Sequence, residues 1–234
     1  AASASAAALA FTSTASAFAV GLGGTGMLLS AAPFAEATAA FGWRATLGVV
    51  SGAAVLMSVA ILLTVRDRAP YSPAPLGSAE SLFEVARGLK FIFREPKLYA
   101  IGAISAITVG SFLTFRALWV GPYLNDTFGS GLIERGNIIF LVSLSWLISA
   151  ICIGPLDRVF DTRRGIVTVG ALSMALWFSV MAIAGNTTVF VATIAMVLLG
   201  LSSGLSSPIF AHVRSLFPDR YVGRVVTANN LFIW

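Results

Sequence analysis

The sequence predicts an all-α protein, a polytopic bundle of membrane-spanning helices. Hydrophobic residues make up 57% of the 234 positions and charged residues 11%, whereas soluble proteins carry roughly 25% charged residues. The apolar residues form long uniform runs, each near the ~20 residues that a helix needs to cross a bilayer core. The strands of a membrane barrel would alternate in polarity instead.

Six apolar runs are complete, and a seventh begins at Val225. They cover about Ala6–Phe34, Ala45–Val65, Leu98–Leu124, Gly136–Leu156, Gly165–Ala184 and Thr188–Phe210. The first run is rich in small residues, which let helices approach closely in lipid, and Pro33 is predicted to end it. The chain starts without Met and stops soon after the seventh run begins, so we expect it to be part of a longer protein.

Residues 66–97 form the only long polar segment. Its first part holds three prolines and predicts an extended linker. Ser81 and Glu84 then have the spacing of a capping box, and apolar residues follow at helical spacing up to Pro96. This pattern predicts an amphipathic helix on the membrane surface.

The basic residues give the chain an orientation. From the first inter-run segment to the last, Lys and Arg number one, six, one, three, none and three, so low and high counts alternate. The positive-inside rule places the high-count segments in the cytoplasm. We therefore expect a multi-pass protein of the plasma (inner) membrane, with the 66–97 linker and the 157–164 and 212–224 loops cytoplasmic.

The sequence contains few of the residues that usually carry catalysis or bind metals. The net charge of +5 comes from basic residues beside apolar runs, which orients a membrane protein and predicts no nucleic-acid partner. Cys152 and His212 are the only cysteine and histidine, and no Asp or Glu lies inside a predicted span. We expect no metal, no cofactor and no enzymatic activity.

Several polar residues inside the spans are candidates to line a solute pathway. Arg116 is the only charge inside a span, and an intramembrane arginine is costly and usually faces a cavity or a partner. On that pathway it would favour an anionic solute, whereas the alternative is an arginine that snorkels to the headgroups or stacks on Trp119. Pro208 predicts a bend in the sixth span. The other candidates are Thr108, Ser111, Thr114, Ser203, Ser207, Asn229 and Asn230, for which helix packing is the alternative.

The segment Gly154–Arg164 reads as a short charged turn between two apolar runs. Charges here can pair with a neighbouring helix in one conformation and separate in another, which would make the turn a gating loop. The alternative is a solvated turn that only sets topology. The residues concerned are Gly154, Asp157, Arg158, Asp161, Arg163 and Arg164.

This layout resembles the major facilitator superfamily of secondary transporters, as found in bacteria. Two spans, a long linker and a further set of spans are similar to the junction between its two six-helix halves, and GPLDRVFDTRR is similar to its G-x-x-x-D-R-x-G-R-R loop. The departures are the spacing of Gly154 to Asp157, Asp161 in place of Gly and one extra residue. Gly42-Trp43-Arg44 and the motif at 118–123 are also common in bacterial members.

The resemblance implies part of that fold. Residues 1–65 would be the last two helices of the first half, 66–97 the cytoplasmic linker, and 98–234 four helices and a truncated fifth of the second half. It implies transport of a small solute by alternating access within the lipid bilayer, with a proton or sodium ion as a candidate coupling ion. A non-transporting scaffold or sensor, and an inactive fragment of a transporter, stay open as alternatives.

Overall fold

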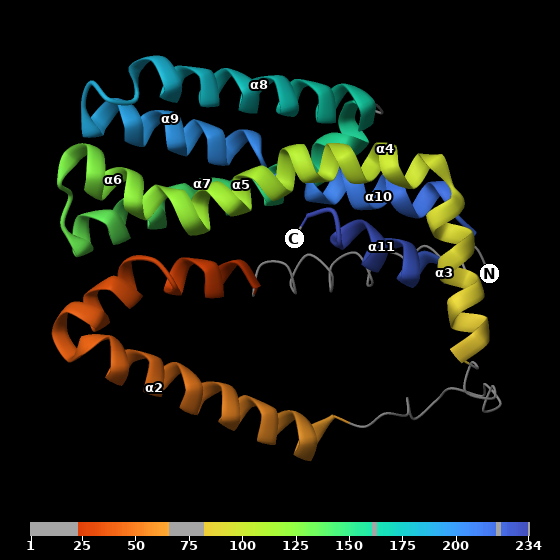
Figure 1. Cartoon of the computed structure of the whole chain (residues 1–234), viewed down its shortest axis with the longest axis horizontal. Helices are drawn as coiled ribbons and strands as arrows, with labels where there is room; N and C mark the ends of the chain where they lie inside the picture. The colour runs from red at the N-terminus through yellow and green to blue at the C-terminus, as the bar shows by residue number, and fades with distance from the viewer. Residues whose placement is uncertain (1–22, 66–81, 161–162, 219–220, 234) are drawn as a thin grey trace.

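The computed structural model describes residues 23–65, 82–160, 163–218 and 221–233. Every regular element within these ranges is helical, which confirms the all-α prediction. Among the residues that the structure describes, four helices are long and apolar enough to cross a membrane: Ala32–Thr64, Pro96–Phe128, Leu132–Ile153 and Arg164–Ala184. Figure 1 shows most helices lying side by side in one bundle, while the second arm of α2 diverges from it.

Helix α2 (Ala32–Thr64) follows a short helix at 23–29 and a turn at 30–31. Pro33 lies in its first turn, where the missing N–H costs no hydrogen bond. The prediction that Pro33 ends a span is therefore wrong, because it begins a new helix there. The true break is Gly42, whose φ of 80° and ψ of 155° divide α2 into two arms.

The second arm of α2 is hydrophobic on all sides. Residues 47–64 are exposed without exception, although this helix is long and apolar enough to cross a membrane. A helix that is apolar all round requires a non-aqueous environment. The arm is therefore suited to contact lipid or other transmembrane helices along its whole length.

We predict that Gly42→Ala destabilises the protein through its backbone alone. A Cβ at Gly42 would meet nothing within 4 Å, but the positive φ is strained for any L side chain. The expected cost is about 1–3 kcal/mol, measured as a lower thermal midpoint in detergent. Gly48→Ala is the matched control, because Gly48 also has open space but no positive φ. Equal midpoints for the two variants would contradict this account.

The predicted amphipathic helix is present as α3 (Leu82–Arg94). Ile92 on its apolar face is fully buried in a core cluster with residues of α4, α10 and α11. Phe91 stacks on Tyr221 with ring centroids 5.1 Å apart. The helix is thus fixed against the bundle as well as being suited to a membrane surface.

The predicted third span is one continuous helix from Pro96 to Phe128 that changes its winding twice. Two π-helical turns are visible as hydrogen bonds five residues long, from Ser111 N–H to Ala106 O and from Val120 N–H to Phe115 O. Pro122 contributes to the second, because it lacks an N–H and its ring crowds the carbonyl four residues earlier. The segments are α4 (Pro96–Ser105), η1 (Ala106–Gly110), α5 (Ser111–Thr114), η2 (Phe115–Trp119) and α6 (Val120–Phe128).

Helix α7 (Leu132–Phe160) extends past the predicted end of the fourth span, and α8 (Arg163–Ala184) begins soon after it. The prediction of a turn over Gly154–Arg164 is therefore wrong in extent, since most of it is helical. The physical reason is that a helix need not end at the edge of the apolar layer. Its last helical turns can carry charged residues and extend into water.

The predicted sixth span is two helices, α9 (Val189–Ser202) and α10 (Ser206–Leu216). The break precedes the predicted bend, and Pro208 lies in the first turn of α10, where it is tolerated. Helix α10 also covers residues 212–216 of the predicted 212–224 loop. Helix α11 (Val222–Asn230) starts three residues before the seventh apolar run.

Helices α7 and α9 approach closely through small residues. A Cβ on Gly200 would meet Ser145 Oγ and lie 2.9 Å from the Val142 carbonyl oxygen. A Cβ on Gly204, in the break, would meet Ser149 Oγ and lie 2.6 Å from Ala150 N. The pattern is the small-xxx-small packing of helices in lipid, with two glycines facing two serines.

Candidate functional site

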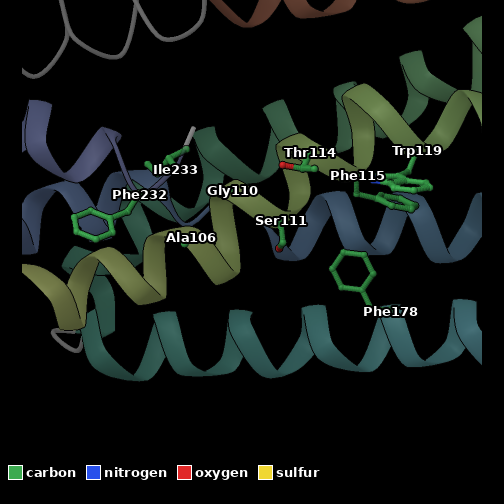
Figure 2. A pocket seen from close by; sticks show the side chains of 9 residues that line it. All are labelled: Ala106, Gly110, Ser111, Thr114, Phe115, Trp119, Phe178, Phe232 and Ile233. Carbon is green, nitrogen blue, oxygen red and sulfur yellow. The ribbon is translucent and has the colours of Figure 1, made fainter.

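A pocket of about 490 Å³ lies beside the two π-helical turns. Figure 2 shows the hydroxyls of Ser111 and Thr114 between aromatic rings at the two ends of the pocket. Phe115 and Phe178 pack edge to face, with centroids 5.5 Å apart. The complete lining is Ala106, Gly110, Ser111, Thr114, Phe115, Trp119, Phe178, Phe232 and Ile233.

The two π-helical turns determine which side chains face this pocket. Ala106 and Gly110 belong to η1, Phe115 and Trp119 to η2, and the two hydroxyls to the α-helical turn between them. A π turn rotates the side chains that follow it, and such turns are frequent at functional sites. The helix therefore presents hydroxyls and aromatic rings to one pocket from consecutive turns.

The polar candidates of this helix differ in their surroundings. Ser111 and Thr114 line the pocket, whereas Thr108 is fully buried and donates to the Ile104 carbonyl at 2.6 Å. Ser111 Oγ also donates to its own helix, at the Ile107 carbonyl. A hydroxyl that donates to backbone still has acceptor capacity, so Ser111 can accept a hydrogen bond from a molecule in the pocket.

Arg116 does not line the pocket. Its side chain extends to two other segments of the chain. Its Nε donates to Ser143 Oγ on α7 at 2.7 Å, and its Nη2 to the Met27 carbonyl at 2.9 Å. Nη2 also lies 3.5 Å from Ser30 Oγ. The guanidinium thus joins the α4–α6 helix, α7 and the 23–30 segment at one point.

The whole chain, residues 1–234, matches the family model described as Major Facilitator Superfamily. The chain belongs to the major facilitator superfamily. Neither a curated protein nor a solved structure matches it. Members of this superfamily are multi-pass membrane transporters of small-molecule solutes, and the long apolar helices of this chain agree with that class.

Other predicted site residues of this superfamily member lie outside the pocket. Asn229 is fully buried and its Oδ1 accepts from Ser105 Oγ at 3.1 Å, while its Nδ2 has no hydrogen-bond partner among the described residues. Asn230 next to it is partly buried. Ser203 is buried and donates to the Gly200 carbonyl at 2.9 Å. The Asn229 bond therefore joins α11 to α4, whereas the Ser203 bond is local to the end of α9.

For most of the remaining candidates of the transporter, only the helix to which they belong is described. Ser207 lies in α10, Gly154, Asp157 and Arg158 lie in α7, and Arg163 begins α8, but their side chains are outside the described part of the structure. Asp161 is outside the described residues altogether, and Arg164 is exposed. The gating role of this segment stays a prediction.

The sequence did not reveal several site residues of this superfamily member. Ser143, Met27 and Ser30 contact Arg116 but lie in distant parts of the chain. Phe178 and Phe232 look like ordinary apolar span residues in the sequence. One signal was available, since a serine in an otherwise apolar span is a natural partner for the single intramembrane arginine.

Proposed function

We propose that this protein is a secondary active transporter or facilitator that moves a small solute by alternating access. The observation that carries this proposal is the 490 Å³ pocket between helices, lined by two hydroxyls and several aromatic rings. Its volume is in the range of small-molecule sites, about 300–1,000 Å³, and its mixture of apolar walls and few polar groups is typical of them.

Two irregular helical regions support the same proposal: the α9–α10 break and the two π turns of the continuous Pro96–Phe128 helix. Transporters commonly place their sites at broken helices, because unwound turns expose backbone groups that regular helices hide. Here the pocket lies on a helix with two π turns, and the α9–α10 break is packed against α7. Arg116, close in sequence to the pocket residues, favours an anionic solute.

The proposed organisation follows the sequence. Residues 1–65 end the first transmembrane half, 66–97 form the cytoplasmic linker with α3, and 98–234 belong to the second half. The protein would reside in the plasma (inner) membrane, with the basic 157–164 and 212–224 segments on the cytoplasmic side. A proton or sodium gradient would supply the coupling if transport is active.

Counterflow in proteoliposomes tests the proposal with the whole protein in its membrane. Vesicles are loaded with one unlabelled solute at a time, from a panel of carboxylates, sugars and amines, and uptake of the same labelled solute is measured. We expect transient accumulation for one class, with carboxylates favoured. Imposed proton and sodium gradients then identify the coupling ion. A lack of counterflow for every class would reject the transporter proposal.

A further inference from the structure

Residues 23–41 lie along helix α7, and we call this contact the seam. A Cβ on Gly136 of α7 would lie 2.5 Å from Ala35 Cβ, and the Leu147 side chain lies over Gly24. The two pairs are equally spaced along both segments and run in opposite directions, so the packing is antiparallel. The seam is therefore a tight contact between a segment before the linker and a helix after it.

Arg116 supplies hydrogen bonds at this seam. It lies on a third element, η2, and donates to Ser143 of α7 on one side and to Met27 and Ser30 on the other. Ser143 Oγ in turn donates to the Ile139 carbonyl at 2.6 Å, which fixes its lone pairs toward the guanidinium. One side chain thus links three elements.

The turn at 30–31 makes the Met27 carbonyl available. Ala31 N–H donates to the Leu28 carbonyl at 3.1 Å, three residues back, rather than continuing the α-helical pattern to Met27. The Met27 carbonyl accepts from Ser30 Oγ at 2.8 Å and from Arg116 Nη2. The helix end therefore presents two oxygen atoms, one carbonyl and one hydroxyl, to the arginine.

All three oxygens that accept from Arg116 are neutral. An arginine forms stronger, bidentate hydrogen bonds with a carboxylate than with single neutral oxygens, and the advantage grows where water is scarce. A carboxylate that reaches the guanidinium would therefore compete with the Met27 carbonyl and the Ser30 hydroxyl for it. Losing these two contacts would remove the polar attachment of the 23–30 segment and leave the seam held by packing alone.

We propose that Arg116 is an anion-released latch: it closes the seam through neutral oxygens, and a carboxylate group of the solute opens the seam by taking its guanidinium. This inference rests on the proposed transport function, and it names the solute class and the step that the solute triggers. By the loop-charge pattern, the seam lies in the half of the membrane away from the cytoplasm, so the latch closes the external side.

A cysteine pair can report whether the seam is closed. A Cβ on Gly24 would lie 3.4 Å from Leu147 Cγ, the position that Sγ takes in a cysteine, and this spacing suits a disulfide. The whole protein is prepared with Gly24→Cys and Leu147→Cys in a background otherwise free of cysteine, including Cys152→Ala. The rate of disulfide formation with a mild oxidant is then measured in membranes.

Arg116→Ala is expected to lower the cross-linking rate by at least about fivefold, the low end of typical coupling between two states. Arg44→Ala is the matched control, because Arg44 is exposed and its guanidinium stacks over Trp43 at 4.3 Å instead of joining the seam. Ser143→Ala removes one acceptor and is expected to give a smaller fall. It also serves as the test if Arg116→Ala does not fold. Equal rates in Ser143→Ala, Arg116→Ala and the control would overturn the latch.

Acetate, succinate and benzoate are then added separately at millimolar concentration, with glucose and choline as controls. At least one carboxylate is expected to slow cross-linking when Arg116 is present, and neither control should. The anion-released latch is overturned if no carboxylate acts beyond glucose. Counterflow of the same preparations separates the two failures: exchange with an unresponsive seam rejects the latch alone, and absence of exchange for every solute rejects the transport function.

Discussion

Replacing Gly204 by leucine is expected to eliminate most of the correctly folded transporter. The glycine lies in the break between α9 and α10, against the backbone of α7. A Cβ there would lie 2.6 Å from both Ala150 N and Ser149 C. Backbone atoms of a packed helix cannot move away as a flexible side chain can, so the two helices must separate.

The smaller change Gly204→Ala measures the same contact on a finer scale. Overpacking a tight site costs about 1–3 kcal/mol, and separation of the helices would also remove the bond from Ser149 Oγ to the Leu201 carbonyl. Because α9 ends at Ser202, the Leu201 carbonyl has no donor in the next helical turn. In lipid no water is present to replace the Ser149 hydroxyl as its donor. Leucine adds three more carbon atoms at this position and should exceed what the contact can absorb.

The measurement is the monodisperse fraction after detergent extraction, followed by the thermal midpoint of that fraction. Gly223→Leu is the control, because Gly223 of α11 is exposed and has nothing within 4 Å of an added Cβ. We expect near-normal recovery for the control and a lower midpoint for Gly204→Ala. Recovery of Gly204→Leu at the control level would show that α7 and α9 do not depend on this contact.

The sequence identified the class of protein because lipid imposes a simple rule on composition. A chain with long uncharged runs must form helices there, since no water satisfies the backbone. Arg116 was recognised as exceptional for the same reason. Hydropathy reports only that a residue contacts an apolar medium, however, and says nothing of which helix it faces. The partners Met27, Ser30 and Ser143 are therefore not visible in the sequence.

The two misjudged prolines show a second limit. Proline breaks a helix interior but fits a first turn, so one residue type can mark an end or a beginning. Pro33 and Pro208 each lie in the first turn of a new helix, and the breaks precede them at 30–31 and 203–205. Only the hydrogen bonds of the folded chain decide between the two. The π turns depend similarly on bonds that no local pattern specifies.

The second large effect is expected from Thr114→Trp, which should reduce transport at least about tenfold by obstructing a small-molecule-sized pocket. Thr114 lines the pocket between Ser111 and Phe115, and its exposed side chain can be enlarged without meeting the packed core (Figure 2). The indole would place a ring between the existing aromatic rings and so obstruct part of the space of about 490 Å³ where a solute would lie. Folding should be retained, because the new ring occupies empty space.

Ile107→Trp provides the matched control for this variant. Ile107 is on the same long helix and is 65% exposed, but it does not line the pocket. Both variants add an indole to that helix, so a general effect of tryptophan on insertion or stability would appear in both. Initial rates of counterflow, normalised to the amount of monodisperse protein, should therefore fall for Thr114→Trp alone. Equal rates for the two variants would place the solute pathway elsewhere, and the hydroxyls of Ser111 and Thr114 would then serve only the packing of their helix.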